Sequence, residues 1–269
     1  MHLDRRLTRP GADIAYTVAG QGLPVVLTHG AGMDHRMFDD QARALVDAGR
    51  RVILWDLRGH GDSSLVDRRF TAADAVDDLS ALLSAADARG AVLVGHSLGG
   101  NLSQELVRVD PAAVSGLVVM DAGWNAGPLS GLERLALSLA APSLALIPAR
   151  TLPALMARAS AVSEEAVIRT TETFARMPKH VFLDVWRATL SLISPDPGYR
   201  TPVPLALVRG AQDRTGNIAS AMPRWAAAEG IAEQVIADAG HIVTWDAPAA
   251  ASEALLRILD EPRFAGRTH

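Results

Sequence analysis

Gly95-His96-Ser97-Leu98-Gly99 is the stretch of this sequence that decides the fold. It follows the apolar run 91–94, which predicts a strand, and opens into the amphipathic segment 98–109, which predicts a helix. A serine at a sharp turn between a strand and a helix projects its hydroxyl to where a substrate can reach it. That turn crowds the residues two before and two after the serine, so both must lack bulky side chains, as Gly95 and Gly99 do.

Composition excludes several classes of protein. The chain has 269 residues, of which 49% are hydrophobic and 21% charged, so it is globular and long enough to bury a large core. Its net charge of −4 gives no indication of the basic surface that nucleic-acid binding requires. A small molecule is therefore the expected partner. The sequence contains no cysteine, which excludes disulfides, thiolate metal sites and a cysteine nucleophile and favours a reducing compartment.

No segment has the pattern of a secretion signal or of a membrane span. The start, Met1-His2-Leu3-Asp4-Arg5-Arg6, runs into polar residues without an apolar region, so a cytoplasmic location is expected. The most apolar stretch, 135–148, is shorter than the roughly 20 residues that a span needs, and it contains Pro142. This stretch therefore predicts a buried helix or a lid helix. The oligomeric state stays open.

Short apolar runs alternate with amphipathic segments along most of the chain. Seven runs predict strands, at 13–18, 25–28, 51–55, 91–94, 117–120, 205–208 and 234–237. Five segments with apolar residues at helical spacing predict helices, at 35–48, 71–88, 98–109, 218–228 and 248–259. Short apolar strands that alternate with helices are typical of a parallel sheet covered on both faces, so the sequence predicts an α/β fold.

One region, 124–200, breaks the alternation because it contains no convincing strand. Apolar residues fall there at helical spacing, namely Leu132, Leu135, Ala136 and Leu139, before three prolines interrupt the pattern, namely Pro142, Pro148 and Pro153. Ser163 is a natural N-cap for a second helix, and 178–193 has the spacing of a third. We therefore expect an all-helical insertion at 124–200, here called the cap, between two parts of a core at 1–123 and 201–269.

Acyl transfer by a serine requires a base that takes the hydroxyl proton, an acid that orients the base, and donors for the oxyanion. His241 follows the last predicted strand and is the candidate base. Asp213, after the strand at 205–208, is the candidate acid, and Asp121, after the strand at 117–120, is the alternative acid. Loops at the carboxyl ends of parallel strands converge on one edge of the sheet, so these side chains can meet there.

Four landmarks occur in order along the chain: His29-Gly30, Asp56-Leu57-Arg58-Gly59-His60-Gly61-Asp62-Ser63, Gly95–Gly99 and Gly240-His241. With them the chain resembles the α/β-hydrolase fold superfamily over nearly its whole length, and the order Ser97, Asp213, His241 is the order of that fold. The resemblance implies a mostly parallel eight-stranded sheet flanked by helices, with a helical cap insertion. It also implies a hydrolase that requires no cofactor.

The resemblance assigns the oxyanion donors as well. In such enzymes one backbone N–H comes from the segment after His-Gly and the other from the residue after the nucleophile, which here are Ala31 and Leu98. Leu98 stands at a predicted helix N-terminus, where unpaired N–H groups and the helix dipole both favour negative charge.

Ser97 also discriminates within the superfamily. Haloalkane dehalogenases and epoxide hydrolases of this type carry an aspartate there, and the epoxide hydrolases tend to have a proline where this chain has Gly32. What remains is mostly hydrolysis of a carboxylic ester, a thioester, an amide or a lactone, and an ester-type bond, in a carboxylic ester, a lactone or a thioester, is the expected substrate. Three alternatives stay open: cleavage of a C–C bond by a hydrolase or lyase, a cofactor-free oxygenase reaction, and a ligand-sensing receptor with slow hydrolase activity.

The substrate is expected to be a small, largely apolar molecule. Five apolar side chains near the predicted cleft are candidates to line its pocket: Met33, Phe38, Trp124, Phe182 and Trp186.

Other conspicuous residues have structural interpretations. Four polar side chains are expected to orient loops by hydrogen bonding: His29, Asp56, Arg58 and His60. His96 has no evident partner, and His35, next to Asp34, is expected to cap a helix or to be exposed. The sequence has no H-x-x-x-H or H-E-x-x-H spacing, so no metal site is predicted, and Gly20 and Gly22 do not extend to a dinucleotide fingerprint.

Overall fold

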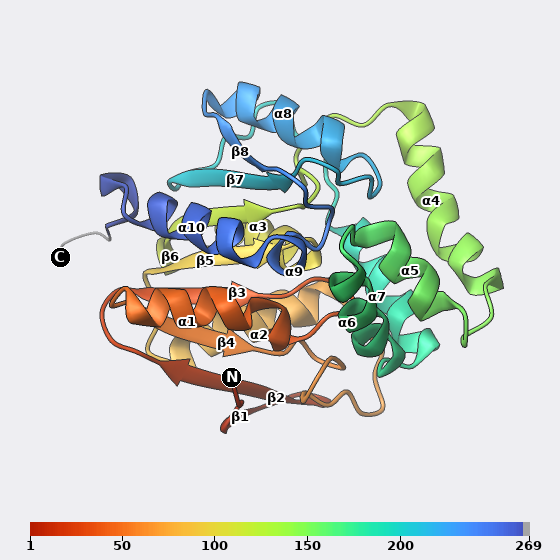
Figure 1. The fold of residues 1–269 in the computed structure, drawn as a ribbon, viewed down its shortest axis with the longest axis horizontal. Helices are drawn as coiled ribbons and strands as arrows, with labels where there is room; N and C mark the ends of the chain where they lie inside the picture. Colours follow the sequence, from red (N-terminus) through yellow and green to blue (C-terminus); the bar gives the residue numbers. More distant parts are fainter. Residues whose placement is uncertain (266–269) are drawn as a thin grey trace.

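A computed structural model of the chain describes residues 1–265, except for the side chain of Ala136 (Figure 1). Its centre is one eight-stranded sheet with the strand order β1-β2-β4-β3-β5-β6-β7-β8. The strands are β1 (Arg5–Arg9), β2 (Ala12–Ala19), β3 (Pro24–Thr28), β4 (Arg51–Trp55), β5 (Ala91–His96), β6 (Val114–Met120), β7 (Leu205–Gly210) and β8 (Glu233–Ile236). Strand β2 pairs antiparallel with β1 and with β4, and the other neighbours are parallel. The predicted mostly parallel eight-stranded sheet is confirmed.

Helices cover both faces of the sheet, as expected for strands that are apolar on both sides. One face packs on α2 (Ala72–Ala85), α3 (Leu98–Val109) and α8 (Ile218–Glu229), and the other on α1 (Asp39–Asp47) and α10 (Pro248–Leu259), with the short α9 (Val243–Asp246) beside them. Side chains alternate between the two faces. Along β3, Val26 packs toward the first group of helices, whereas Val25 and Leu27 pack toward the second.

Strand β1 is absent from the predicted strands. Its sequence, Arg-Arg-Leu-Thr-Arg, has no apolar run because it forms an edge strand that pairs only with β2, where Leu7 lies opposite Ile14. The predicted helix at 35–48 begins later than expected. Its first turn is a 3₁₀ helix, His35–Phe38, capped by the side chain of Asp34.

Four helices occupy the region predicted as the cap: α4 (Gly131–Leu146), α5 (Leu152–Ser160), α6 (Glu164–Ala175) and α7 (Lys179–Ser191). Ser163 caps α6 as predicted, since its hydroxyl accepts from the Ala166 N–H. The expectation that Pro142 interrupts the first helix is wrong, because Pro142 lies inside α4 at an exposed position. Pro153 stands in the first turn of α5, where a missing N–H breaks no helical hydrogen bond.

The cap helices lie beside the carboxyl ends of the central strands (Figure 1). The apolar stretch 135–148, predicted as a buried or lid helix, belongs largely to α4, where Leu135 and Leu139 are exposed rather than buried. Among the described residues, no helix combines the length and the apolar character that crossing a membrane requires.

Buried polar side chains in the turn after β4 connect neighbouring segments by hydrogen bonds. The buried carboxylate of Asp56 accepts from the backbone N–H of His35 at 2.6 Å and from that of Asp62 at 2.7 Å. The guanidinium of Arg58 donates two bonds of 2.7 Å to Asp78. The structural interpretation of these side chains is therefore confirmed. That of His35 is corrected: its ring is buried, and Nδ1 lies 3.0 Å from the Asp56 carboxylate.

His60 in the same turn is a buried histidine with a lowered pKa. Its Nδ1–H donates to the carbonyl oxygen of Arg58 at 3.0 Å, and its ring packs between His29 and Phe70. Burial lowers the pKa of His60 from 6.5 to about 4, so the folded protein holds the ring neutral.

This pKa shift predicts a loss of stability in mild acid. Below pH 6.5, the pKa of the ring in the unfolded chain, the unfolded chain binds a proton at His60 that the folded protein does not bind. The stability that the neutral His60 ring contributes is therefore present above pH 6.5 and is lost as the pH falls toward 4. The loss amounts to about 2 kcal/mol at pH 5. In His60→Asn the amide keeps a donor for the Arg58 carbonyl but does not titrate. Between pH 7 and pH 5 the free energy of unfolding, measured with urea, should therefore decrease by about 2 kcal/mol less in His60→Asn than in the wild type.

His2→Asn is the matched control, because it makes the same substitution at an exposed histidine outside this turn. If the free energy of unfolding decreases equally in the wild type and in His60→Asn between pH 7 and pH 5, His60 is not the source of the loss of stability.

Candidate active site

Ser97 sits at the predicted turn between β5 and α3. Its φ of 50° lies in the left-handed region, which for a residue other than glycine costs on the order of 1–3 kcal/mol. A Cβ on Gly95 would lie 2.4 Å from the carbonyl oxygen of Gly99, and a Cβ on Gly99 would lie 2.2 Å from that of Thr28. The structure thus shows the crowding that makes both glycines necessary.

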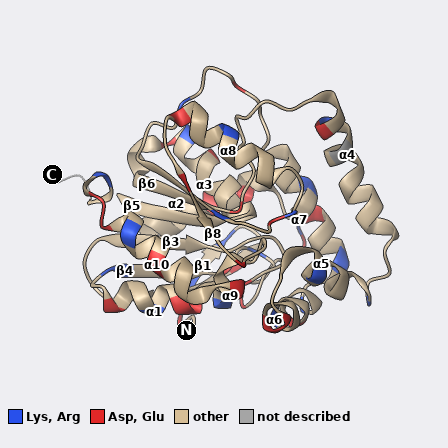
Figure 2. Cartoon of the chain, turned by 45° about the horizontal axis from the view of Figure 1, so that its top comes forward, with Lys and Arg blue, Asp and Glu red and all other residues tan. Residues whose placement is uncertain are grey.

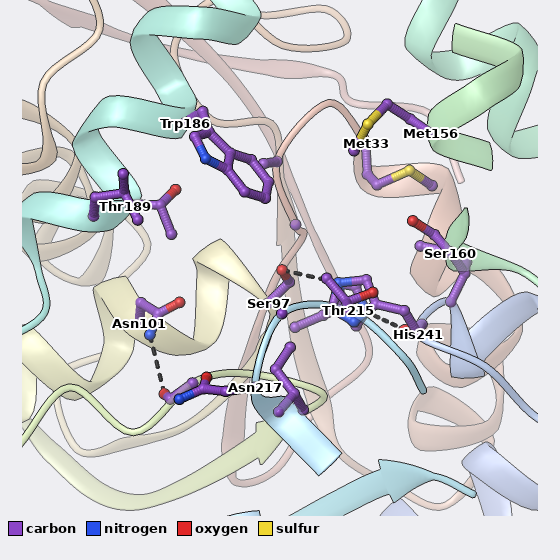
Figure 3. Close-up of a pocket in the computed structure, with 18 of the residues that line it drawn as sticks. Met33, Ser97, Asn101, Met156, Ser160, Trp186, Thr189, Thr215, Asn217 and His241 are labelled. Atoms are coloured by element: carbon purple, nitrogen blue, oxygen red, sulfur yellow. Dashed lines mark hydrogen bonds between the residues drawn. The ribbon is translucent and has the colours of Figure 1, made fainter. Parts of the chain in front are cut away.

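Ser97, His241 and Asp213 form one hydrogen-bonded chain (Figure 3). The Nε2 atom of His241 lies 3.0 Å from the Oγ of Ser97, and its Nδ1 lies 3.0 Å from Oδ2 of Asp213. A carboxylate can only accept, so Nδ1 carries the proton and Nε2 is free to accept from the serine hydroxyl. The three residues come from the loops after β5, β7 and β8, which end at the same edge of the sheet.

Asp213 is held as an anion. Burial alone would raise its pKa, but the charge and hydrogen bond of His241, together with the Thr215 N–H at 2.7 Å, outweigh burial and lower it. A carboxylate in this state can orient the imidazole and stabilise its charged form.

Asp121, the alternative acid, is placed differently. It follows β6 with a φ of 44°, and its Oδ1 accepts from the Gly210 N–H at 2.8 Å. Its Oδ2 is buried and has no hydrogen-bond partner among the described residues. Burial, followed by the neighbouring charge of Asp213, raises the pKa of Asp121 well above its usual range. The structure thus brings Asp213 into hydrogen-bond contact with the ring of His241.

The two predicted oxyanion donors flank Ser97. Leu98 is the first residue of α3, so its N–H has no partner within the helix. Ala31 lines the same cavity as Ser97 and follows His29-Gly30. The ring of His29 fixes this loop, because Nδ1–H donates to the Gly30 carbonyl at 2.8 Å and Nε2 accepts from the Leu57 N–H at 2.9 Å.

His96 has a partner that the sequence did not reveal. Its Nε2–H donates to the carbonyl oxygen of His241 at 2.7 Å, and the two rings lie 4.8 Å apart. Burial lowers the pKa of His96 to about 3, so it is neutral. The expectation of no partner is wrong, since only the fold brings the end of β5 next to the loop after β8. His96 thereby holds the backbone of His241.

A cavity that is partly open to solvent lies over Ser97 and His241 between the sheet edge and the cap. Met33, Phe182 and Trp186 line it, as predicted. Phe38 does not, because its side chain is fully buried in the core under α1. Trp124 does not line it either, because its ring stacks on Trp225 of α8 at 6.0 Å.

Comparison with known proteins places the chain in a family. A sequence model of the alpha/beta hydrolase family matches residues 25–254. The chain belongs to this family. Two curated relatives are a non-heme chloroperoxidase, CPO-A1, of Kitasatospora aureofaciens, 45% identical over 93 residues, and a non-heme chloroperoxidase of Streptomyces lividans, 36% identical over 118 residues. The alignments cover 35% and 43% of this chain and 34% and 43% of those relatives, so the chain spans less than half of their length.

Solved structures resemble this chain over almost its whole length. An esterase from Thermogutta terrifontis is 25% identical with a TM-score of 0.75, and a hydrolase from Pseudomonas aeruginosa is 25% identical with a TM-score of 0.80. Each comparison covers 95% of this chain and 98% of the other. The superfamily resemblance and the fold are confirmed, and the neighbours support a hydrolase.

Several polar residues of this alpha/beta hydrolase line the cavity without having been predicted: Asn101, Ser160, Thr189, Thr215 and Asn217. Figure 3 shows Trp186 and Thr189 on one side of Ser97 and Met156 and Ser160 on the other. The position of Asn101 could have been inferred, because it stands four residues after Ser97 on the same face of α3. No Asp, Glu, Lys or Arg lines the cavity in the described part of the chain.

Two groups of side chains in residues 1–265 bring three possible metal-ligand atoms within 4.8 Å: His35, Asp56 and Asp62, and Asp121, Asp213 and His241. In the first group His35 Nδ1 and the Asp62 N–H already occupy the Asp56 carboxylate. The second group contains the hydrogen bond between Asp213 and His241. We propose neither as a metal site.

Proposed function

We propose that this protein is a serine hydrolase that cleaves an ester-type bond of a small molecule, in a carboxylic ester, a lactone or a thioester, through an acyl-enzyme. The observation that carries this proposal is the hydrogen-bonded chain from Asp213 through His241 to Ser97, at the floor of a cavity that no Asp, Glu, Lys or Arg of residues 1–265 lines. A serine, a base and an oriented acid in this geometry are the components of nucleophilic acyl transfer.

In the first half of the reaction, the Oγ of Ser97 attacks the acyl carbon while its proton passes to Nε2 of His241. Asp213 stabilises the resulting imidazolium through the Nδ1–H bond of 3.0 Å. The imidazolium then gives the proton to the leaving alcohol or thiol, the acyl–heteroatom bond breaks, and the acyl group remains on Ser97.

The N–H groups of Ala31 and Leu98 are the proposed donors to the tetrahedral oxyanion. Each would stabilise the transition state by roughly 3 kcal/mol, the typical effect of one donor in such a site. The helix dipole of α3 acts in the same direction at Leu98.

In the second half, His241 takes a proton from a water molecule, whose oxygen attacks the acyl carbon. The bond from the acyl carbon to Ser97 breaks, and the proton returns to Oγ. The products are the free acid and the resting enzyme, so no cofactor is required.

The cavity supports a largely apolar substrate. Aromatic and sulfur-containing side chains from the cap, including Phe174, Phe182, Trp186 and Met156, form much of its wall. A charged group placed there would lose its hydration without gaining a partner of opposite charge.

Labelling with a fluorophosphonate probe tests the proposal. The folded protein should acquire one phosphonyl adduct on Ser97, identified by peptide mass spectrometry, and heat-unfolded protein should acquire none, since the reactivity depends on His241. If the folded protein leaves Ser97 unmodified, the proposed function is wrong.

The names of the chloroperoxidase relatives favour a second candidate, acyl transfer to hydrogen peroxide. Peroxide would replace water in the second half: a bond forms between its oxygen and the acyl carbon, the bond to Ser97 breaks, and a peracid leaves. Peracid formed from an ester and peroxide, detected by bromide-dependent bromination of a dye and absent in Ser97→Ala, would demonstrate it. Hydrolysis without any peracid would reject it.

A further inference from the structure

Asn101 presents a hydrogen-bond acceptor to the active-site cavity. Its backbone N–H donates to the carbonyl oxygen of Ser97 at 3.0 Å, so its side chain lies one turn of α3 beyond the nucleophile. Residues at this spacing have Cβ atoms about 5–6 Å apart. Asn101 is 5% exposed and lines the cavity, and Figure 3 shows its amide oxygen turned toward Ser97.

The neighbours of this amide fix its orientation. Its Nδ2 donates to the Gly123 carbonyl at 3.0 Å and to Oδ1 of Asn125 at 2.6 Å. Asn125 is itself oriented, because its Nδ2 donates to the Asn101 carbonyl at 2.9 Å and its backbone N–H donates to Oε1 of Gln104 at 2.9 Å. A flipped amide at Asn101 would set its oxygen against two other oxygens, so Oδ1 must face the cavity. There it accepts no hydrogen bond from residues 1–265.

The same side of the cavity holds a second acceptor. Thr189 of α7 lies on this side of Ser97 (Figure 3), and its hydroxyl donates to the Val185 carbonyl at 3.0 Å, so its lone pairs remain for a ligand. The ring N–H of Trp186 has no partner among the described residues, but it is buried and is not exposed to the cavity. A ligand on this side therefore meets acceptors and is complemented by a donor.

The donor must be neutral. No Asp, Glu, Lys or Arg of residues 1–265 lines the cavity, and α4, which contributes Leu137 to its wall, is free of charged residues over most of its length (Figure 2). An ammonium group would lose its hydration there without gaining a carboxylate. An amide N–H would bring a carbonyl, which the two acceptors cannot satisfy. A hydroxyl brings a donor without a carbonyl.

The position of His241 assigns this donor to the acyl part of the substrate. In the proposed reaction Nε2 of His241 gives its proton to the leaving oxygen, so the leaving group lies on the side of Ser97 that faces His241. Figure 3 shows Asn101 on the opposite side of Ser97. The rest of the acyl group, which extends from the same tetrahedral carbon, is therefore directed toward Asn101 and Thr189.

We propose that Asn101 selects esters of hydroxy acids, because its Oδ1 accepts from a hydroxyl on the α or β carbon of a short acyl chain. One helical turn separates Ser97 from Asn101, and only a few bonds separate such a hydroxyl from the acyl carbon on Oγ, so the two spans match. This inference rests on the proposed function, since it requires that Ser97 carries the acyl group.

Hydrolysis of matched p-nitrophenyl esters tests the proposal. Each pair compares a hydroxyl with a methyl group of similar size, either in α-hydroxybutyrate and α-methylbutyrate or in β-hydroxybutyrate and β-methylbutyrate. In at least one pair the ratio of kcat/KM, hydroxy ester over methyl ester, should be at least about tenfold higher in the wild type than in Asn101→Leu. Comparing the two proteins removes the intrinsic reactivity of the esters. Each ratio is measured on one preparation, so unfolded protein does not affect it.

Asn101→Asp and Asn217→Leu are the matched controls. The first keeps an oxygen toward the cavity but lacks the NH₂ group that holds Gly123 and Asn125, and it should retain the preference for the hydroxy ester. The second makes the leucine substitution at another asparagine of the cavity wall. Asn217 is half-buried and its Nδ2 donates to Glu133 at 3.0 Å, so Asn217→Leu should also retain the preference.

Three results would overturn the proposal. The wild type and Asn101→Leu could have equal ratios for both pairs. Asn101→Asp could lose the preference together with Asn101→Leu, which would make the NH₂ group and its loop contacts responsible. Asn217→Leu alone could lose it, which would make Asn217 the acceptor. Failure of the proposed function gives a different result, because then no ester is hydrolysed in a reaction that Ser97→Ala abolishes, and both proposals are wrong.

Discussion

Ser97→Ala is expected to lower kcat for ester hydrolysis by about 10⁴- to 10⁶-fold, with little change in stability. The side chain supplies the attacking oxygen, and the structure places that oxygen 3.0 Å from the base. Any residual rate would come from oxyanion donors that act on a water molecule. Steady-state kinetics with p-nitrophenyl butyrate measure the loss.

Ser160→Ala is the matched control. Ser160 also lines the cavity, but its side chain has no hydrogen bond to His241, so its removal should change kcat only a few-fold. Ester hydrolysis by Ser97→Ala within tenfold of the wild type would reject the acyl-enzyme. The same variant separates the alternatives, since a C–C cleavage or oxygenase reaction that needs only His241 as base would survive it.

Asp213→Asn should reduce kcat by about 10⁴-fold, whereas Asp121→Asn should reduce it by less than about tenfold. An amide at residue 213 cannot hold the Nδ1–H of His241 or stabilise the imidazolium. At residue 121 burial and the charge of Asp213 raise the pKa and favour the neutral acid, which asparagine imitates in shape and charge.

The pH dependence of kcat/KM provides the second readout for this pair. Asp121→Asn should leave the acidic limb in place, because it replaces one neutral group with another. If Asp121 were instead the anion that supports the imidazolium, its removal would move the acidic limb to lower pH. A larger loss in Asp121→Asn than in Asp213→Asn would make Asp121 the acid.

The core strands and the turn at Ser97 could be predicted because their signals are local. Few backbone conformations fit an apolar run that ends in two glycines around a serine, because a Cβ at Gly95 or at Gly99 would clash with the neighbouring backbone. Strand β1 lacked such a signal, because an edge strand exposed to solvent does not need apolar residues.

The cap was predicted as helical, but the directions of its side chains were not. Phe174 of α6 lies over Gly32, where a Cβ would be 2.3 Å from its ring, and this contact places it in the cavity wall. Phe38 and Trp124 are equally apolar in sequence but pack elsewhere. The orientation of each helix about its own axis, relative to the sheet, determines which aromatic residue faces the cavity. Amino-acid composition does not determine that orientation.

The sequence by itself determined the α/β fold and the turn that exposes Ser97, because each depends on residues close together in the chain. It also marked His241 as the candidate base, because that residue follows the last predicted strand. Only the tertiary structure shows that the carboxylate of Asp213, and not that of Asp121, lies at hydrogen-bond distance from Nδ1 of His241. Both follow a strand at the same edge of the sheet, and only the spacing of neighbouring strands sets which carboxylate reaches Nδ1 of His241. The tertiary structure also decided that the outer leucines of α4 remain uncovered, because a helix that is apolar on two faces does not show in its sequence which face the protein buries.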